Sequence, residues 1–428
     1  MKKELLVNLN NLLLSLSEVV DYINPSVDQH QYRTAYIALE MAKACRSDLD
    51  IQEKIFSAAL LHDIGAITVE EKIDLHGFES VDPQVHAMKG AVLLEQVPWL
   101  SPLSEIVATH HREWKDWNRP IQDPIVFGSQ VILLADYVER MVDRSQYILH
   151  QSPHIIREVS KLSGTVLHPE ILRCFLSIAE REEFWLDLVS SRLYSLLLSN
   201  GPFSNIQIGL DDVALISELY KDLIDFKSRY TAAHTSGVSE CAVLMADYFG
   251  MAEIDLKSMR IAGNFHDVGK LVIPNSILEK PGRLTKEEYD IIRCHTYYTY
   301  YTLTSIGGLQ RIAEWAAYHH EKLDGSGYPF HLGRHEIGTG SRIMAVADIF
   351  TAISEDRPYR QGMVKNEIYQ VFQNLVKEEA LDKRIVDLLF DNYESINDHV
   401  KEKQAIALTF YQNKFQTFHH RLKNYPGL

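Results

Sequence analysis

Apolar residues recur every three or four positions along most of this chain, which is the periodicity of a helix with one buried face. The pattern covers residues 5–20, 37–44, 51–61, 169–198, 211–228 and 366–400. Glycine and proline, which end helices, fall between such stretches, as at Gly65 and Pro83. Alternating apolar and polar runs, which are typical of strands, are rare. The sequence therefore predicts an all-α protein with almost no sheet.

A set of histidine and aspartate landmarks occurs twice in the same order, which indicates an internal repeat. The first half carries His30, His62, Asp63, His86, His110, His111 and Asp136. The second half carries His234, His266, Asp267, His295, His319, His320 and Asp348. In both halves the first two histidines are 32 residues apart, and the histidines of the third and fourth landmarks are 24 residues apart. The chain therefore contains one helical module twice.

The repeat and the turn-forming residues give the expected domain limits. The first module spans residues 1–200, a linker rich in turn-forming residues spans 201–210, and the second module spans 211–428. A helix should begin near the end of the linker, with Asp211 or Asp212 as its cap. Residues 167–172 and 381–386 resemble each other, so both modules should end in similar amphipathic helices.

Composition narrows the class of protein. The 428 residues are 46% hydrophobic and 24% charged, which is ordinary for a globular protein, and the net charge is −15. That charge repels a nucleic-acid polymer but permits a small phosphate ligand in a locally positive pocket. The four cysteines form no CxxC pair, no disulfide framework is expected, and no stretch is apolar enough to span a membrane. We therefore expect a cytoplasmic protein without a membrane anchor.

Adjacent His and Asp residues are well suited to a pair of metal ions. One imidazole can bind one ion while the neighbouring carboxylate bridges to a second ion, and the paired histidines supply further ligands. Imidazole with carboxylate favours iron, manganese, zinc or nickel over calcium or magnesium. A His-Asp pair alone is usually only a polar pair near a helix end, so the interpretation depends on the ordered set.

The segments HDVGK (266–270) and HHEKLDGSGYP (319–329), followed by RPYR (357–360), resemble the HD-GYP family of bacterial cyclic-dinucleotide phosphodiesterases. The resemblance runs from about residue 225 to residue 360 and implies tandem HD-domain helical bundles. It implies one metal held by His234, His266, Asp267 and Asp348. It implies a second metal held by Asp267, His295, His319 and His320. Both would be divalent transition metals, iron or manganese, bridged by Asp267.

The resemblance also implies roles for residues around these metals. Asp267 and Lys270 would be catalytic, because Lys270 lies one helical turn from His266 and reaches the same pocket. Tyr328, Arg357 and Arg360 would bind the substrate, since guanidinium groups suit phosphate.

Two positions of the second module depart from the family pattern. Tyr230 replaces a glutamate that brings a third metal in some members, so a two-metal site is expected. Thr299 replaces the usual glycine, inside a run of tyrosines from Tyr297 to Tyr301 that predicts core packing or a reshaped pocket wall.

The first module keeps its seven ligand types but loses other parts of the pattern. Ala66 stands where the second module has Lys270, and neither GYP nor RPYR has a counterpart. We expect a degenerate HD module that retains a metal. It could pack on the second module through Trp114 and Trp117, sense a ligand, or remove a terminal phosphate from the linear product; the structural role is favoured.

The resemblance implies a metal-dependent phosphodiesterase that opens 3′,3′-cyclic GMP-AMP or cyclic di-GMP to the linear 5′-phosphorylated dinucleotide. The tandem arrangement is similar to that of the family members that act on cyclic GMP-AMP, so the resemblance favours this substrate, although no residue distinguishes adenine from guanine. Two alternatives remain: a non-catalytic cyclic-dinucleotide sensor, and an HD phosphohydrolase acting on mononucleotides. A homodimer or a signalling partner is left open by the sequence.

Overall fold

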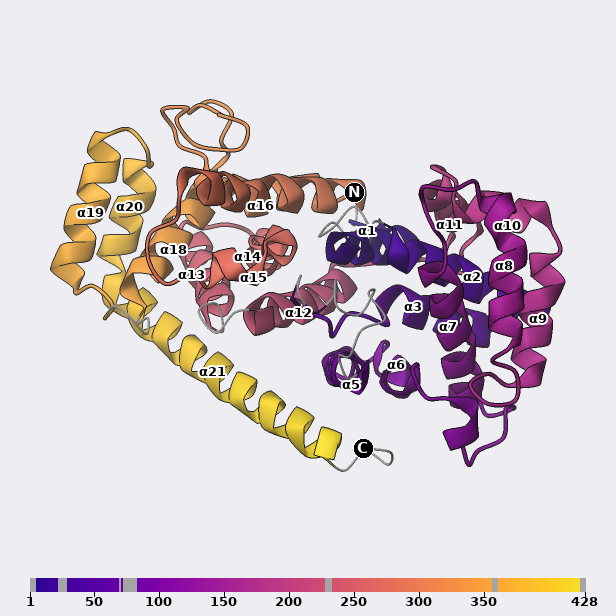
Figure 1. Ribbon diagram of the computed structural model, residues 1–428. Helices are drawn as coiled ribbons and strands as arrows, with labels where there is room; N and C mark the ends of the chain where they lie inside the picture. The colour runs from indigo at the N-terminus through magenta and orange to yellow at the C-terminus, as the bar shows by residue number, and fades with distance from the viewer. Residues whose placement is uncertain are drawn as a thin grey trace. The chain divides into compact units, whose positions relative to one another are not determined.

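The structure is a computed structural model that describes residues 5–21, 29–68, 71, 83–227, 233–355 and 361–423. Helices make up almost all of it, which confirms the predicted all-α class (Figure 1). Two short strands, β1 (Val7–Asn8) and β2 (Gln207–Ile208), pair with each other. Among the described residues, no helix combines the length and apolar character needed to cross a membrane.

The chain divides into two compact units, one of residues 8–207 with 416–428 and one of residues 1–7 with 208–415. In the described residues between β1 and β2 the helices are α1 (Leu9–Asp21), α2 (His30–Ala44), α3 (Leu49–Leu61), α5 (Pro83–Leu94), η1 (Ser101–Leu103), α6 (Ser104–Thr109), η2 (Trp114–Asp116), α7 (Pro124–Arg140), α8 (Ile148–Ser160), α9 (Pro169–Ala179), α10 (Glu182–Leu188) and α11 (Leu193–Asn200).

The helices after β2 are α12 (Leu210–Lys227), α13 (His234–Tyr248), α14 (Glu253–Phe265), η3 (Val268–Val272), α15 (Asn275–Leu278), α16 (Lys286–Ser305), α17 (Gln310–Ala317), η4 (Tyr318–His320), α18 (Thr339–Ser354), α19 (Lys365–Lys377), α20 (Lys383–Asp391) and α21 (Tyr393–Lys423). Because α12 already begins at Leu210, Asp211 and Asp212 lie in its first turn rather than before it, and Asp212 Oδ2 accepts from the Gly209 amide at 3.4 Å.

Helix α2 is the centre of the first unit and packs against α3, α7 and α9. Most of its residues are buried, including Tyr32, Ile37 and Met41, which is the condition of a helix covered on nearly every side. Helix α3 begins at a cap where Asp48 accepts from the Ile51 amide, at 2.9 Å. Because α2 is surrounded by these helices, its first residue, His30, lies inside the bundle with none of its surface exposed.

A disulfide joins the end of α2 to α9. Cys45 follows α2 and Cys174 lies on α9, with their Cα atoms 5.5 Å apart. The sequence predicted no disulfide framework and gave no sign of this single bond, which forms because the packing of α9 on α2 brings together two cysteines that are 129 residues apart in sequence. Cys241 and Cys294 are free thiols.

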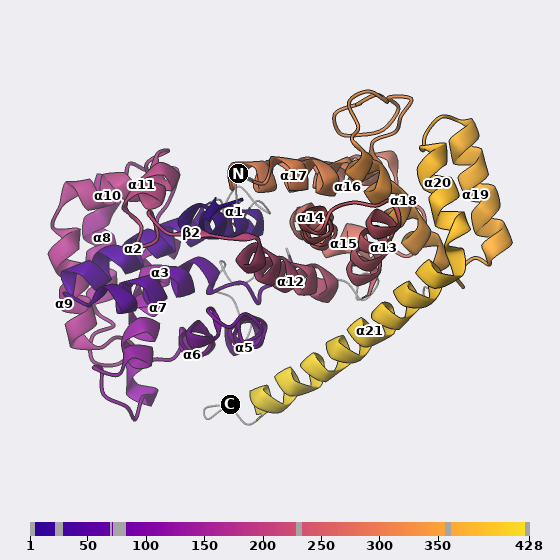
Figure 2. The same ribbon diagram turned by 180° about the vertical axis from the view of Figure 1, so that it is seen from behind.

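The second unit repeats this arrangement with α13 at its centre, packed on α14 and α18 (Figure 2). The likeness extends to the ends of the modules. His168 accepts from the Glu170 amide to cap α9, and Asp382 accepts from the Arg384 amide to cap α20, at 3.1 and 2.9 Å. A histidine and an aspartate thus cap the equivalent helices of the two repeats.

Candidate metal centres

The second unit gathers seven side chains, named here the C-terminal cluster: His234, His266, Asp267, His295, His319, His320 and Asp348. They come from five parts of the bundle: the start of α13, the segment just after α14, the middle of α16, η4 and the middle of α18. All are buried except His320, whose side chain is 30% exposed. Residues far apart in sequence therefore converge because the helix ends meet inside the bundle.

The cluster falls into two groups with a carboxylate between them. One group is His234, His266 and Asp348, and the other is His295, His319 and His320, with the ligand atoms of each group within 4.8 Å of one another. Asp267 faces both groups: Oδ2 lies 3.2 Å from His266 Nε2, and Oδ1 lies 3.4 Å from His295 Nε2. This is the arrangement that a bridging carboxylate requires.

Three of these imidazoles are oriented by the helix turn that precedes them. His266, His295 and His319 each donate from Nδ1 to the carbonyl three residues earlier, at 2.7 Å. The proton is therefore on Nδ1, and the Nε2 lone pair points into the cluster, which is how hydrogen bonding commonly orients metal-binding histidines. Sequence spacing alone gave no sign of these bonds.

Two atoms at the middle of the cluster make no hydrogen bond to a described residue, although other ligand atoms lie close to them. His266 Nε2 and Asp267 Oδ1 are fully buried, and neither has a hydrogen-bond partner in the described part of the chain. An orphaned buried acceptor is costly unless something binds it. The residues present thus fit a bound cation at this point.

Electrostatics in the cluster favour neutral imidazoles and ionised carboxylates. Burial lowers the pKa of His295 to about 3 and that of His319 to about 4. Burial alone would raise the pKa of Asp267, but the neighbouring His266 and the charge of Lys270 hold it well below its usual range. Deprotonated imidazole and carboxylate are the forms that bind metal ions.

His234 differs, because its Nδ1 faces a carboxylate rather than a carbonyl. Glu355 Oε2 lies 3.6 Å from His234 Nδ1, and Asp348 Oδ1 lies 3.2 Å from Nε2. Although burial lowers its pKa, the hydrogen bond to Asp348 and the nearby carboxylate of Glu355 raise it to about 9. Metal binding at His234 must therefore displace a proton at neutral pH.

The turn formed by residues 266–269, named here the HD turn, packs closely against α16. A side chain at Gly269 would put its Cβ atom 2.0 Å from the His295 carbonyl oxygen, so only glycine fits there. Thr299 then joins the two segments, accepting from the Gly269 amide and donating to the His266 carbonyl, both at 3.1 Å. Its hydroxyl fixes the turn that carries His266 and Asp267.

The other predicted site residues of this unit lie beside the cluster or outside the described residues. Lys270 Nζ is 2.5 Å from Asp267 Oδ2. The Tyr328 ring is 4.9 Å from the ring of His320. Arg357 and Arg360, like Tyr230, lie outside the described residues.

The tyrosine run before the GYP loop is only partly core. Tyr300 stacks on Tyr318 and contacts Phe330. Tyr297 and Tyr301 are 45% and 47% exposed, so core packing is the wrong prediction for these two. They leave an aromatic surface along α16.

The first unit holds a matching N-terminal cluster: His30, His62, Asp63, His86, His110, His111 and Asp136. Six of these residues form two groups of ligand atoms, both containing Asp63, and Asp136 Oδ1 lies 3.6 Å from His30 Nε2. Asp63 lies 3.3 Å from His62 Nε2 through Oδ2 and 3.1 Å from His86 Nε2 through Oδ1. His62 and His110 again donate from Nδ1 to carbonyls three residues earlier, at 2.8 and 2.6 Å. The geometry that could hold two cations is thus present in both units.

The surroundings of the N-terminal cluster are different. Ala66 is buried where the second unit has Lys270. Glu139 Oε2 contacts His30 Nδ1 at 2.6 Å, and Arg140 contacts Asp136 at 3.3 Å. Sequence analysis missed Glu139, Arg140 and Glu355, because the two glutamates lie three and seven residues after the repeated aspartate and so do not occupy equivalent positions.

In the first unit, the two tryptophans that follow the paired histidines pack against residues of the same unit. The Trp114 ring packs on His168, with centroids 4.4 Å apart, and the Arg112 guanidinium lies 4.8 Å from the Trp117 ring. Both tryptophans therefore have partners inside their own unit. Whether they also pack on the second module stays a prediction.

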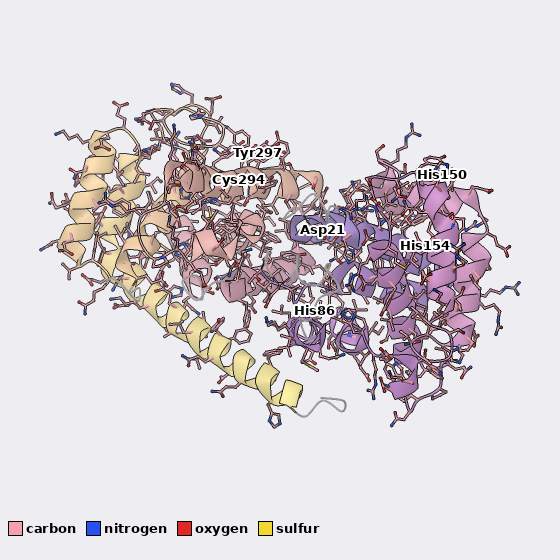
Figure 3. The ribbon with its side chains drawn as sticks, in the orientation of Figure 1. Asp21, His86, His150, His154, Cys294 and Tyr297 are labelled. Atoms are coloured by element: carbon pink, nitrogen blue, oxygen red, sulfur yellow. A yellow bond between two sulfur atoms is a disulfide. The ribbon has the colours of Figure 1, made fainter. Side chains whose placement is uncertain are left out.

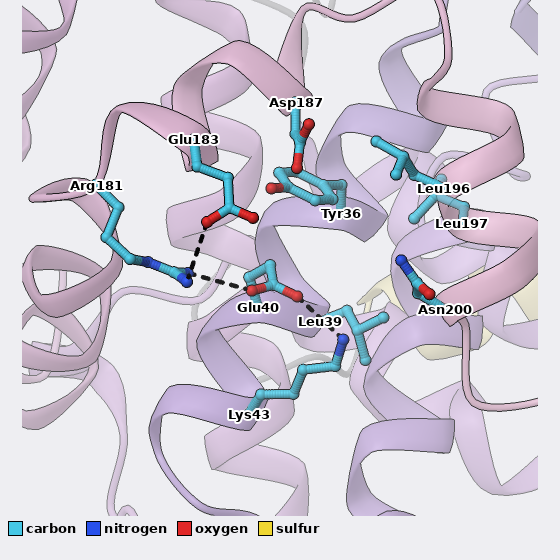
Figure 4. A pocket seen from close by; sticks show the side chains of 10 residues that line it. All are labelled: Tyr36, Leu39, Glu40, Lys43, Arg181, Glu183, Asp187, Leu196, Leu197 and Asn200. Atoms are coloured by element: carbon cyan, nitrogen blue, oxygen red, sulfur yellow. Dashed lines mark hydrogen bonds and ion pairs between the residues drawn. The ribbon is translucent and has the colours of Figure 1, made fainter.

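A surface pocket of the first unit is lined by none of the residues of the cluster (Figure 4). It is lined by α2, α11 and the segment around α10. Three of its charged side chains pair: Glu40 contacts Lys43 at 3.0 Å and Arg181 at 3.4 Å. These pairs partly neutralise the pocket, which gives no sign of a particular ligand.

Comparisons with known proteins agree with the repeat. Models of the HD domain match residues 27–141 and 218–385. The chain is 30% identical over 399 residues to 3′3′-cGAMP-specific phosphodiesterase 1 of Vibrio cholerae, covering 90% of this chain and 92% of the relative. It is 29% identical to 3′3′-cGAMP-specific phosphodiesterase 3 of the same organism, covering 72% of this chain and 68% of the relative.

A solved structure has the same fold. The crystal structure of a cyclic GMP-AMP-specific phosphodiesterase of Vibrio cholerae aligns with a TM-score of 0.61 at 20% sequence identity, covering 94% of this chain and 97% of that one. HD domains as a class bind divalent metals, and the two buried clusters are suited to them. By its near full-length similarity and its two HD domains, the chain belongs to the HD-GYP family of phosphodiesterases.

Proposed function

We propose that the second unit is a two-metal phosphodiesterase that opens a cyclic dinucleotide, 3′,3′-cyclic GMP-AMP or cyclic di-GMP, to the linear 5′-phosphorylated form. The observation that carries this proposal is the pair of orphaned atoms, His266 Nε2 and Asp267 Oδ1, inside a buried cluster next to Lys270. The near full-length relative named for cyclic GMP-AMP supports that nucleotide as the first substrate to test.

The C-terminal cluster would hold the metals as two groups that share Asp267. Two iron or manganese ions held there would lower the pKa of water and neutralise phosphoryl oxygens during attack on phosphorus. The protein orients the ligands: hydrogen bonds from Nδ1 to backbone carbonyls fix the imidazoles, and Thr299 fixes the HD turn. Hydrolysis forms a bond from water oxygen to phosphorus and breaks the bond from phosphorus to the ribose 3′ oxygen.

Lys270 is the residue that the proposal places nearest to the reacting phosphate. Its ammonium group contacts Asp267 and is 20% exposed, so it stands between the cluster and solvent. A cation there would attract the phosphate and could give a proton to the departing 3′ oxygen. Tyr328 lies on the same side, beside His320, where its hydroxyl could contact the substrate.

For the first unit, we infer a metal-binding module without the cyclic-dinucleotide apparatus. The converged N-terminal cluster supports metal binding, and the absence of a lysine at Ala66 argues against the same reaction there. Packing against the second unit remains the favoured role. The alternative is that this unit removes the terminal phosphate from the linear product, which analysis of the reaction products would detect.

The test is to incubate the purified full chain with each cyclic dinucleotide and Mn²⁺ or Fe²⁺ and to follow products by chromatography and mass spectrometry. His266→Ala should abolish ring opening, and the equivalent change His62→Ala should leave it intact. Binding without product would identify a sensor. Turnover of mononucleotides alone would identify a general phosphohydrolase, and either result would refute the proposal.

A further inference from the structure

An arginine outside the C-terminal cluster is attached to it through the GYP loop. Arg293 lies on α16, two residues before His295, and its guanidinium is 4.9 Å from the centre of the Tyr328 ring. The same ring lies 4.9 Å from the ring of His320, at an angle of 37°. Tyr328 therefore connects Arg293 to a member of the cluster, and the guanidinium stands at the rim of the site.

The ring that supports Arg293 is itself held in place. The buried carboxylate of Glu321 accepts from the amides of Phe330 and Leu332, at 2.7 and 2.9 Å, which folds the loop back on itself. The Tyr328 amide donates to the His320 carbonyl at 3.2 Å. A guanidinium that stacks on a fixed aromatic ring loses less freedom when it binds an anion, so the position is preorganised for recognition.

The ion pair between Arg293 and its acidic neighbour Asp290 is weak. Asp290 lies 3.5 Å from the guanidinium, and the two side chains are 36% and 54% exposed. Pairs of this kind contribute little, so Asp290 would not compete strongly with a phosphate. Exposed rings flank the arginine along α16: Tyr289 is 46% exposed, and Tyr297 lies one turn further on, close to Cys294 in Figure 3.

A cyclic dinucleotide carries two phosphodiesters, and only one can be cleaved at the metal pair at a time. The other must lie outside the cluster, on a protein whose net charge of −15 repels anions unless a local cation attracts them. A guanidinium offers the paired N–H donors that match phosphate oxygens. We propose that Arg293, stacked on Tyr328, binds the phosphate that is not being cleaved. This inference rests on the proposed function of the second unit.

The experiment separates recognition of the second phosphate from chemistry at the first. Arg293→Ala and Arg293→Lys are compared with wild type on the cyclic dinucleotide and on bis(p-nitrophenyl) phosphate, a diester with one phosphate. Loss of a charge-assisted bond should raise KM for the dinucleotide ~10- to 100-fold in Arg293→Ala, with kcat little changed. Hydrolysis of the small diester should stay as in wild type, and Arg293→Lys should recover part of the affinity.

Arg311→Ala is the matched control. Arg311 lies on α17, stacks over Trp315 at the same 4.9 Å and pairs with Asp255, but it does not contact the GYP loop within the described residues. Its removal should leave both substrates unaffected. An unchanged KM in Arg293→Ala, or an equal loss on both substrates, would overturn the inference, because the second result would mean that Arg293 supports the cluster itself.

A binding measurement distinguishes failure of this inference from failure of the proposed function. Calorimetry with a phosphorothioate analogue of the cyclic dinucleotide should give a dissociation constant raised by the same factor in Arg293→Ala. If wild type binds the analogue but hydrolyses nothing, the proposed function fails while a shifted constant still supports Arg293. If wild type neither binds nor hydrolyses, both fail.

Discussion

His30 Nδ1 lies 2.6 Å from the Oε2 atom of Glu139, and both side chains are buried in the first unit. Most of the other histidines for which Nδ1 has a described partner donate to a carbonyl, which is neutral. A carboxylate in this position makes the imidazole a stronger donor to a metal through Nε2. Burial would lower the pKa of His30, but the charge of Glu139 raises it well above its usual value.

The first prediction is that Glu139→Gln weakens metal binding by the first unit. Loss of such a carboxylate typically costs ~10- to 100-fold in metal affinity, so the metal content of the full chain should fall after dialysis against a weak chelator. Metal analysis by mass spectrometry measures it. Glu158→Gln, at an exposed ion pair on α8, should retain all metal. Full metal content in Glu139→Gln would mean that the contact is only structural.

The second prediction concerns Lys270, whose ammonium lies 2.5 Å from Asp267 Oδ2. Lys270→Met removes the charge and the proton donor but keeps the length of the side chain. We expect kcat on the cyclic dinucleotide to fall by ~10²- to 10⁴-fold, the usual contribution of a positioned acid, with metal content preserved. The exposed Lys322, in the loop after the paired histidines, provides the control variant Lys322→Met. Turnover that survives in Lys270→Met would remove the lysine from the chemistry.

The periodicity of apolar residues was sufficient to predict the helical fold, and the repeated spacings were sufficient to predict two equivalent sets of candidate ligands. They succeed because helix ends in an all-α bundle are marked by local residues, as the equivalent caps His168 and Asp382 illustrate. Repeated spacings also pointed to equivalent pairs such as His62 and His266. Everything that these features predicted depends on contacts close in sequence or on identity between the two halves.

The features that were missed depend on packing between segments. Cys45 and Cys174 meet only because α9 lies on α2, and no spacing rule signals that. Glu139 and Glu355 contact equivalent histidines from positions that are not equivalent, so comparison of the repeats hides them. Tyr297 has helical spacing that fits a core, yet the face of α16 that it occupies is open to solvent.

The third prediction concerns the disulfide in the first unit. A cross-link between Cys45 and Cys174 closes a loop of 129 residues, which in the chain-entropy treatment stabilises the fold by about 4 to 5 kcal/mol. Cys45→Ser should therefore lower the unfolding temperature of oxidised protein, and reductant should lower that of wild type to match. Cys294→Ser removes a free thiol and should change nothing. Equal unfolding temperatures with and without reductant would contradict the cross-link.

The last prediction is a pH dependence that comes from Asp382, the cap of α20. Its side chain accepts from the Arg384 amide and from the Arg342 guanidinium, at 2.9 and 2.7 Å. Burial alone would raise its pKa, but hydrogen bonds from Arg384 and Arg342 lower it to about 2. Because the folded pKa lies below the unfolded value near 3.8, the ionised carboxylate stabilises the fold above pH 4. That stability is lost as pH falls from about 4 to about 2.

Asp382→Asn keeps a capping side chain but removes the charge. At pH 7 the variant should be less stable than wild type by about 1 to 2 kcal/mol, allowing for screening at the exposed Arg384. The difference should shrink as pH is lowered toward 2, where wild type loses the same charge. Urea unfolding across this range measures it, with Asp387→Asn at the exposed pair with Lys383 as control. A difference that stays constant with pH would show that the charge of Asp382 contributes nothing and that only its shape matters.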